Sequence, residues 1–184
     1  MDTKRLIREK YFLKRKRLFF EIKKTYFKPL INIIRVKNIK TKTNISLYYP
    51  SNFEVNILKI LDIDFFKKFN FSLPVIKKNQ EMQFFRWKKG DILQINKYGI
   101  PEPKTSKKIN PGVILVPLLA FDKNKNRIGY GRGYYDKFLN TLLKKHKKHL
   151  TVGIAFSFQK HHNLPVDKRD IKLNHILTEK GIIS

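Results

Sequence analysis

Apolar positions recur along this chain with two different spacings, one typical of helices and the other of strands. In three segments the apolar residues return every three or four positions between charged ones, which predicts amphipathic helices. The expected helices span residues 3–28, 54–69 and 134–145. Pro29 limits the first of them, and Ser51 or Asn52 would cap the second. Residues 30–43 fit neither spacing clearly.

Short apolar runs bounded by turn residues predict the strands. The expected strands span residues 45–49, 71–76, 113–116 and 151–156, with a short last one near 176–177. Residues 82–87 and 92–95 are expected to pair as an inserted hairpin. Residues 100–103 should form a rigid turn, because two prolines there fix φ. The run at 113–116 is almost continuously apolar, which is typical of a strand buried on both faces of a parallel sheet.

The alternation of strands with helices predicts an α/β domain in layers, with a mostly parallel sheet. A length of 184 residues suffices for a substantial core, and we expect a single domain over residues 1–184. Ligands of such sheets bind beyond the carboxyl ends of the strands. The loop that follows Val116 is therefore the first place to look for a functional site.

The chain is strongly basic, with 41 lysines and arginines, 14 acidic residues and a net charge of +27. Such a charge is typical of proteins that bind nucleic acid or anionic membranes. The lysines are spread along the whole chain, however, and accompany many asparagines, isoleucines and aromatic residues, which an AT-rich genome over-supplies. Composition drift therefore explains much of the charge, while attraction of a polyanionic small ligand and binding of nucleic acid stay open.

Two absences narrow the class of protein further. No apolar run approaches the roughly 18 residues that a membrane span needs, so we expect no membrane partner. The chain has no cysteine, which excludes disulfides, thiolate zinc sites and cysteine nucleophiles. Both features suit a protein of the reducing cytoplasm.

Three glycines at alternate positions, Gly129, Gly131 and Gly133, follow the apolar strand. Glycine adopts backbone conformations that other residues avoid and lets a bulky anion approach closely. The helix expected just after them would point free N–H groups at such an anion. Asp136 offers a carboxylate for a hard cation such as Mg²⁺. The cationic side chains beside the loop are Arg127, Arg132 and Lys137. The segment predicts a phosphate site, with a ligand-free glycine turn as the plainer alternative.

The spacing of this loop excludes two common nucleotide motifs. A P-loop needs Gly-x-x-x-x-Gly-Lys-Ser/Thr, which is absent from the sequence. The dinucleotide fingerprint needs Gly-x-Gly-x-x-Gly and an acidic residue about 20 positions later. Here the glycines run Gly-x-Gly-x-Gly, and Asp136 comes three residues after the last of them.

Several short motifs stand in a characteristic order along the chain. The most specific are Val116-Pro117, Phe121-Asp122, Arg127-Ile128-Gly129 and Gly131-Arg132-Gly133-Tyr134-Tyr135-Asp136. Weaker ones are Lys4-Arg5-Leu6-Ile7-Arg8, Glu54-Val55-Asn56, Pro74, Met82-Gln83-Phe84 and Glu102-Pro103. In this order the sequence resembles the 5-formyltetrahydrofolate cyclo-ligases, also called methenyltetrahydrofolate synthetases, over essentially its full length. The resemblance implies a three-layer α/β/α fold of the CoA-transferase-like cyclo-ligase type, with a mostly parallel central sheet.

The resemblance also implies a reaction, the ATP- and Mg²⁺-dependent cyclisation of 5-formyltetrahydrofolate to 5,10-methenyltetrahydrofolate with release of ADP and phosphate. In the family's mechanism the formyl oxygen attacks the γ-phosphate, N10 attacks the carbon of the phosphorylated formyl intermediate, and phosphate leaves. An amide oxygen is a weak nucleophile and oxide a poor leaving group, so phosphorylation activates the carbon. The protein mainly has to position the substrates and neutralise charge on the phosphoryl group.

Individual residues receive roles from the same resemblance. Lys4 and Arg132 are expected to be catalytic. The ATP-binding residues would be Lys4, Arg5, Leu6, Ile7, Arg8, Arg127, Ile128, Gly129, Tyr130, Gly131, Arg132, Gly133, Tyr134 and Tyr135. The folate would contact Tyr49, Glu54 and Tyr134, and Mg²⁺ would be held by Asp136 and Asp170. The expected partner is the small-molecule folate, with or without a polyglutamate tail, bound by a monomer.

Plainer roles exist for the same residues. Lys4 and Arg8 could be solvated helix charges, Glu54 an acid that favours a helix dipole, and Asp170 a surface carboxylate. The alternative function is a basic nucleic-acid-binding protein on a degenerate cyclo-ligase scaffold. Another enzyme of ATP or phosphosugar chemistry is a third, because fold alone does not fix chemistry. The enzyme is favoured because a scaffold without turnover should have lost at least one of these cations, aspartates or glycines.

Overall fold

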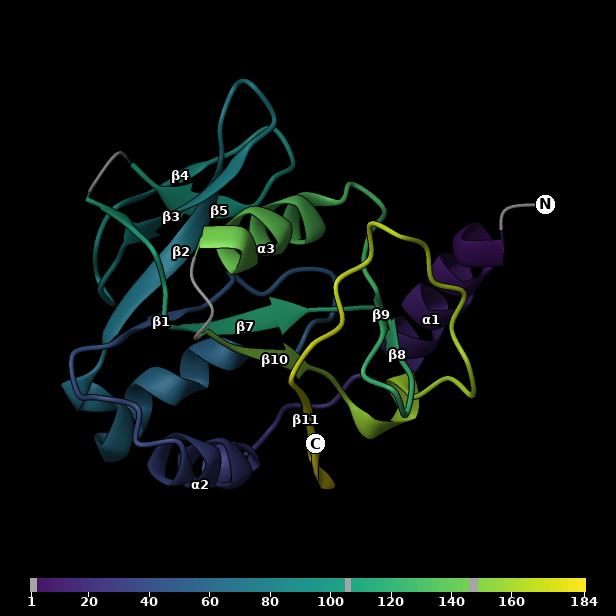
Figure 1. Cartoon of the computed structure of the whole chain (residues 1–184), viewed down its shortest axis with the longest axis horizontal. Coiled ribbons are helices and arrows are strands. Elements are labelled where there is room, and N and C mark those ends of the chain that lie inside the picture. The colour runs from purple at the N-terminus through teal and green to yellow at the C-terminus, as the bar shows by residue number, and fades with distance from the viewer. Residues whose placement is uncertain (1–2, 105–106, 146–148) are drawn as a thin grey trace.

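An eight-stranded sheet is the centre of the computed structural model, which describes residues 3–104, 107–145 and 149–184 (Figure 1). The strand order is β12-β11-β10-β7-β1-β2-β3-β6. These strands are β1 (Asn44–Ser46), β2 (Asn70–Ile76), β3 (Met82–Arg86), β6 (Lys108–Ile109), β7 (Val113–Pro117), β10 (Leu150–Ile154), β11 (His175–Thr178) and β12 (Gly181–Ile183). The five strands from β11 to β2 run parallel, and antiparallel pairs flank them at both edges. The mostly parallel sheet expected from the sequence is confirmed.

Helices cover both faces of this sheet. They are α1 (Thr3–Leu18), α2 (Lys28–Val36), α3 (Tyr134–Lys145) and the 3₁₀ helices η1 (Lys24–Phe27), η2 (Ile57–Asp62), η3 (Asp64–Lys68) and η4 (Ser157–Gln159). Figure 1 shows α2 and α3 on opposite sides of β7 and β10. Val113 and Leu115 of β7 pack into the apolar cluster that contains α2, whereas Ile114 and Val116 pack into the cluster that contains α3. The expected three-layer α/β/α arrangement is therefore confirmed.

The single long helix expected over residues 3–28 is wrong. α1 ends at Leu18, and α2 follows as a separate helix with Pro29 in its first turn, where the missing proline N–H costs no hydrogen bond. The break between them lets Tyr26 pack into the core, where its hydroxyl lies 2.9 Å from the carbonyl oxygen of Ala155. None of the helices within the described residues is long and apolar enough to cross a membrane.

The helix expected over residues 54–69 is also wrong, because this segment forms the two 3₁₀ helices η2 and η3. Its buried core side chains are Ile57, Ile60, Phe66 and Phe69, which stand at multiples of three residues, the period of a 3₁₀ helix. The expected cap at Ser51 or Asn52 is not formed, since η2 begins after Asn56 and has no side-chain cap.

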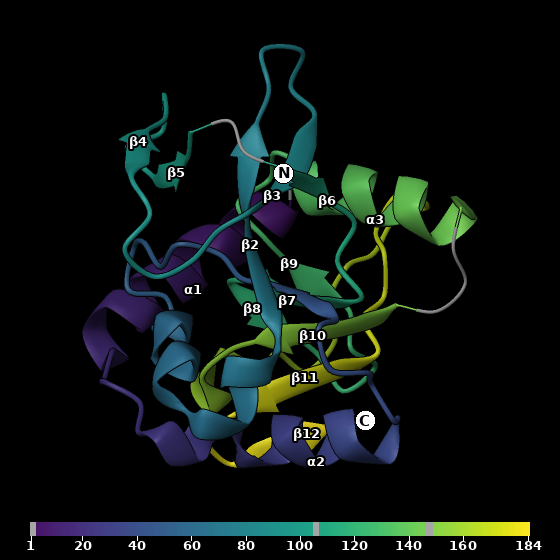
Figure 2. The ribbon, with the colours of Figure 1, turned by 90° about the vertical axis from the view of Figure 1, so that its left-hand side faces the viewer.

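The expected hairpin between residues 82–87 and 92–95 does not form either. β3 instead pairs with β2 and β6, and β4 (Leu93–Ile95) pairs with β5 (Pro101–Pro103), in the segment expected to be a rigid turn. A two-stranded ribbon is all edge, so prolines are tolerated in β5. Figure 2 shows this small ribbon beside the β2–β3 ribbon, to which it is joined by a hydrogen bond of 3.3 Å from the N–H of Ile76 to Oε2 of Glu102. β1 is shorter than expected and ends at Ser46.

The core is packed most closely at Gly153 in β10. A Cβ atom there would lie 2.6 Å from Cδ1 of Ile176 and 2.8 Å from Cδ2 of Leu118. Both neighbours are buried, so a methyl group at this position must displace packed side chains.

We therefore expect Gly153→Ala to lower the free energy of unfolding by about 1–3 kcal/mol, the usual cost of overpacking a core. Urea unfolding followed by the fluorescence of Trp87 measures this change. Gly129→Ala is the matched control, because a Cβ at Gly129 meets nothing within 4 Å. A Gly153→Ala protein as stable as the wild type would show that the core has room there.

Candidate active site

A cavity of about 990 Å³ opens where β1, β2 and β7 end, at the carboxyl edge of the sheet. Its location is the one expected from the parallel topology. Each of the elements at this edge contributes to its wall: α1, the segment after β1, β2, β3, the β4–β5 ribbon, the loop between β9 (Arg127–Ile128) and α3, and the segment before β11. The cavity therefore depends on residues from nearly the whole length of the chain.

The glycine loop lies between β9 and α3, as expected. Gly131 and Gly133 have φ values of +92° and +69°, a region of backbone conformation that favours glycine. The backbone N–H of Lys137 makes the hydrogen bond to the Gly133 carbonyl, 2.9 Å long, that closes the first turn of α3. The backbone N–H groups of Tyr134, Tyr135 and Asp136 have no acceptor within the helix, because an α-helix leaves its first amides unpaired. They are therefore donors for a ligand at this end of the cavity.

Two cations of α1, Lys4 and Arg8, line the cavity together with the glycine loop. Nε of Arg8 donates to the carbonyl oxygen of Gly129 at 3.1 Å. The Arg8 guanidinium carbon lies 3.1 Å from the position that a Cβ on Gly131 would occupy, so a side chain there would press on it. Arg8 therefore lies directly against the glycine loop.

The three residues between these cations do not line the cavity, although the sequence placed them with the ATP-binding residues. Arg5 is exposed and pairs with Glu9 on the same helix, 3.1 Å away. Leu6 is exposed, and Ile7 is buried in an apolar cluster beneath β8 (Ala120–Phe121) and β9. The physical reason is helical geometry: positions four apart share a face, and the positions between them point elsewhere.

The two carboxylates expected to hold Mg²⁺ both line the cavity, and each is paired with a cation. Asp136 accepts from Nη2 of Arg127 at 2.7 Å and from the N–H of Ile171 at 3.1 Å, both on Oδ1. Asp170 accepts from Nζ of Lys4 at 2.5 Å. Within the described residues no three His, Asp or Glu side chains form a metal-binding group. Two carboxylates together with phosphate oxygens are nevertheless a usual Mg²⁺ environment, so the donor set fits.

The ion pair between Lys4 and Asp167 shifts the pKa values of both partners. Burial opposes the charge on Lys4, but its hydrogen bonds with Asp167 and Asp170 outweigh this effect and raise the Lys4 pKa. The hydrogen bond from Lys4 lowers the pKa of Asp167 to about 2. Lys4 and Asp167 therefore keep their charges at neutral pH.

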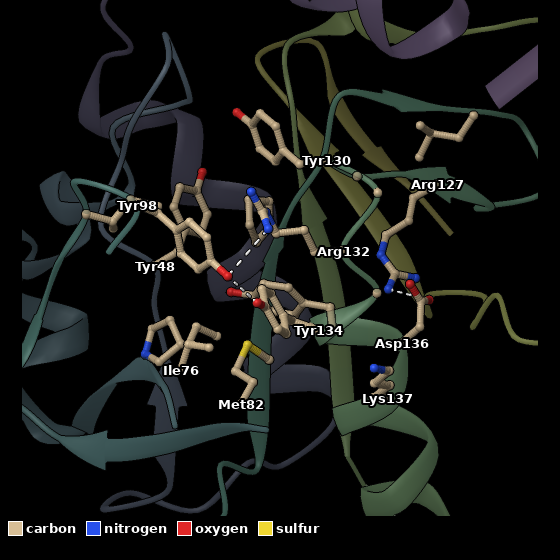
Figure 3. A pocket seen from close by; sticks show the side chains of 18 of the residues that line it. Tyr48, Ile76, Met82, Tyr98, Arg127, Tyr130, Arg132, Tyr134, Asp136 and Lys137 are labelled. Atoms are coloured by element: carbon tan, nitrogen blue, oxygen red, sulfur yellow. Dashed lines mark hydrogen bonds and ion pairs between the residues drawn. The ribbon is translucent and has the colours of Figure 1, made fainter. Parts of the chain in front are cut away.

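Arg132 reaches across the cavity to the β4–β5 ribbon. Its guanidinium lies 4.3 Å from the centre of the Tyr98 ring, and the Tyr98 and Tyr134 hydroxyls are 2.6 Å apart (Figure 3). Tyr134 in turn donates to Oε1 of Gln80 at 2.8 Å. The hydrogen bond between the two hydroxyls lowers the pKa of Tyr98, whereas burial raises the pKa of Tyr134. These contacts join the ribbon to the glycine loop.

Glu54 lies on the opposite wall and is 7% exposed. Its Oε2 accepts the backbone N–H of Ser51 at 2.9 Å, and its Oε1 accepts the Tyr130 hydroxyl at 3.2 Å. Burial raises the pKa of Glu54, and the charge of Arg15 opposes that rise. Half-buried Tyr49 lines the same wall. The interpretation of Glu54 as a first-turn helix acid is wrong, since no α-helix begins there.

Several residues of the cavity wall were missed by the sequence analysis. They are Tyr48, Ile76, Met82, Asn96, Tyr98, Ile100 and Asp167. Met82 reaches the site because β3 runs antiparallel to β2, so that its first residue pairs with Ile76, the last residue of β2. Tyr98 reaches it because of the β4–β5 ribbon. For Ile76 and Met82, the ends of the apolar runs in the sequence were a usable signal. For Tyr98 the sequence offered no signal.

The two walls differ in chemistry. Arginine, lysine and backbone amides gather at the glycine loop, which suits a polyphosphate. Aromatic and apolar side chains around Glu54 suit a flat ring that donates hydrogen bonds. The cavity can thus hold a polyanion and a ring system side by side.

Comparisons with known proteins agree with this arrangement. A sequence model of the 5-formyltetrahydrofolate cyclo-ligase family matches residues 1–179. The 5-formyltetrahydrofolate cyclo-ligase of Haemophilus influenzae is 30% identical over 154 residues, covering 80% of each chain. The structure of 5,10-methenyltetrahydrofolate synthetase from Aquifex aeolicus has a TM-score of 0.75 and 32% identity, covering 97% of this chain and 91% of that one. The structure of the synthetase from Mycoplasma pneumoniae has a TM-score of 0.71 and 25% identity, covering 97% and 99%. With a match of this extent, the chain belongs to the 5-formyltetrahydrofolate cyclo-ligase family.

Proposed function

We propose that this protein cyclises 5-formyltetrahydrofolate to 5,10-methenyltetrahydrofolate at the expense of ATP, with Mg²⁺, releasing ADP and phosphate. The observation that carries the proposal is the two-sided cavity, with cations and loop amides on one wall and a buried carboxylate among aromatic rings on the other. Membership of the family supplies the reaction class.

The phosphate end would be held by charge. Lys4 and Arg8 would contact the triphosphate from α1, and Arg127 with the amides of the glycine loop from the other side. Asp136 and Asp170 would hold Mg²⁺, which when bound neutralises phosphate charge. Arg5, Leu6 and Ile7 lie outside the cavity wall, so we assign them no contact with the triphosphate.

The folate end would be held by Tyr49, Glu54 and Tyr134. An ionised Glu54 only accepts hydrogen bonds, which suits the N–H donors of a pterin ring. Tyr134 starts α3 and lies between the two walls, bonded to Tyr98. It can therefore contact the folate where the formyl group would meet the phosphate.

The reaction itself mainly requires that the protein position its two substrates. The formyl oxygen would take the γ-phosphoryl group, N10 would close onto the formyl carbon and lose its proton, and the oxygen would depart in phosphate. Arg132 and Lys4 would stabilise the charge on the phosphoryl group during transfer, a role for which fixed cations are suited. The stacking of Arg132 on Tyr98 holds its planar group near the loop.

We further propose that residues 1–184 act as one domain and as a monomer in the cytoplasm, on folates with or without a polyglutamate tail. The high positive charge would favour the tail, whose carboxylates are anionic.

The first test is the absorbance of methenyl-folate in the near-ultraviolet, with purified protein, 5-formyltetrahydrofolate and Mg-ATP. We expect a rise that requires ATP. A flat trace from folded protein that binds ATP would defeat the proposal. Binding of DNA or RNA that weakens steeply with salt would then bring forward the nucleic-acid alternative.

Asp136→Asn tests the metal assignment. Because this change removes one negative oxygen, we expect turnover to fall about 10- to 100-fold and the Mg²⁺ concentration for half-maximal rate to rise. Asp64→Asn is the control, since Asp64 is exposed and pairs with Lys67 far from the cavity wall. An unchanged Mg²⁺ dependence in Asp136→Asn would assign Asp136 to Arg127 alone.

Arg132→Met tests the catalytic assignment. We expect kcat to fall about 100- to 1000-fold, the usual effect of losing one charge that stabilises the transition state, with a smaller effect on folate KM. Arg132→Lys should restore little, because an ammonium does not reproduce the planar stacking on Tyr98. Full activity of Arg132→Met would remove Arg132 from the reaction.

A further inference from the structure

Arg15 is a buried cation outside the set of residues discussed for catalysis. It stands in the last turn of α1 and is 1% exposed. Its Nη1 donates to the carbonyl oxygen of Leu118 at 3.2 Å, and its Nη2 donates to the hydroxyl oxygen of Tyr130. Within the described part of the chain it forms no direct ion pair. A buried charge without a counter-charge is costly, so its compensation must come through a neighbour.

The Tyr130 hydroxyl connects Arg15 to Glu54. It accepts from Arg15 and donates to Oε1 of Glu54 at 3.2 Å. The Arg15 guanidinium also lies 5.5 Å from the centre of the Tyr130 ring. A cation, a hydroxyl and a carboxylate thus form a continuous line from α1 to the cavity wall.

The other groups that face Glu54 come from several elements. They are Ser51, which donates its backbone N–H, and the tyrosines Tyr48, Tyr130 and Tyr135. Burial raises the pKa of all three tyrosines, so they are neutral at neutral pH. Among the described residues that face Glu54, Arg15 is the one that carries a charge.

We propose that Arg15 and Tyr130 form a relay that keeps Glu54 ionised and oriented toward the folate. Both are positioning residues, since they act on the ligand through Glu54. The relay rests on the proposed function, and it assigns Tyr130 to the folate wall instead of the ATP site.

The relay matters because two opposing effects act on Glu54. Burial raises its pKa, whereas the charge of Arg15 and the hydrogen bond from Tyr130 lower it. Removing Arg15 or the Tyr130 hydroxyl therefore takes away one of the effects that lower the pKa of Glu54. The carboxylate of Glu54 then becomes protonated at a higher pH. A protonated Glu54 presents a donor to the ring N–H groups that it should accept.

Tyr130→Phe is the primary test, because the ring is partly exposed and keeps its shape in the variant. We expect the KM for 5-formyltetrahydrofolate to rise about tenfold or more, as for loss of a hydrogen bond to a charged group. The KM for ATP and kcat at saturating folate should change little. The acid limb of the pH profile of kcat/KM for the folate should move to higher pH, because that limb reports the free protein.

Arg15→Lys is the second variant, and it should show the same shift of the acid limb to a smaller extent, because the charge stays while the fork is lost. The controls are Arg17→Met, an exposed arginine of the same turn, and Tyr11→Phe, which loses a buried hydroxyl bonded to the Lys160 carbonyl at 2.9 Å. Neither control should move the pH profile. Unfolding curves of all variants separate folding defects from changes in binding.

The outcomes distinguish the relay from the proposed function. A wild-type protein that turns over, together with a Tyr130→Phe variant whose pH profile and folate KM are unchanged, overturns the relay alone. A rise in the KM for ATP in place of the folate KM also overturns it and returns Tyr130 to the ATP site. A wild-type protein without turnover defeats the proposed function. In that case the relay is still tested by the pH dependence of folate binding, measured by calorimetry on the wild type and on the Tyr130→Phe variant.

Discussion

The burial of β7 on both faces is the constraint on which the rest of the structure depends. Its side chains alternate between the α2 cluster and the α3 cluster, and its backbone pairs in parallel with β1 and β10. A strand held on both faces and both edges can leave the core only at its end, here at Pro117. The glycine loop and the segment after β1 therefore open at the same edge of the sheet, and the cavity forms between them.

Counter-charge pairing governs the cavity wall. In a chain with a net charge of +27, two of the cations at the site are held by carboxylates nearby: Arg127 by Asp136, and Lys4 by Asp167 and Asp170. These pairs fix long side chains in one geometry before any ligand binds, which lowers the entropy that binding must overcome. A polyphosphate would then share each cation with its carboxylate. Arg15 and Glu54 are likewise paired, but indirectly, because the Tyr130 hydroxyl accepts from Arg15 and donates to Glu54.

The sequence was a better guide to the loop than to the segments around it. Gly131 and Gly133 could be singled out because positive φ is a local requirement that few residues meet. The segment 57–69 misled because apolar residues are abundant there at both three- and four-residue spacings, and only packing in the core decided that Ile57, Ile60, Phe66 and Phe69 are the buried ones. Leu6 and Ile7 were grouped with Lys4 because they belong to the same motif of the family that the sequence resembles, although a helix points them away from the cavity.

By itself, the sequence determined the alternation of strands and helices, the position of the glycine loop and the helix that follows it, because each depends on spacing within a short segment. Only the tertiary structure decided that Tyr98 would meet Arg132, that Met82 would reach the cavity, and that Arg15 would approach Glu54 through Tyr130. These contacts join residues far apart in the chain, and they follow from sheet order and strand direction. No local spacing encodes these contacts, because they form only after the strands have assembled into the sheet and Arg15 and Glu54 have been buried.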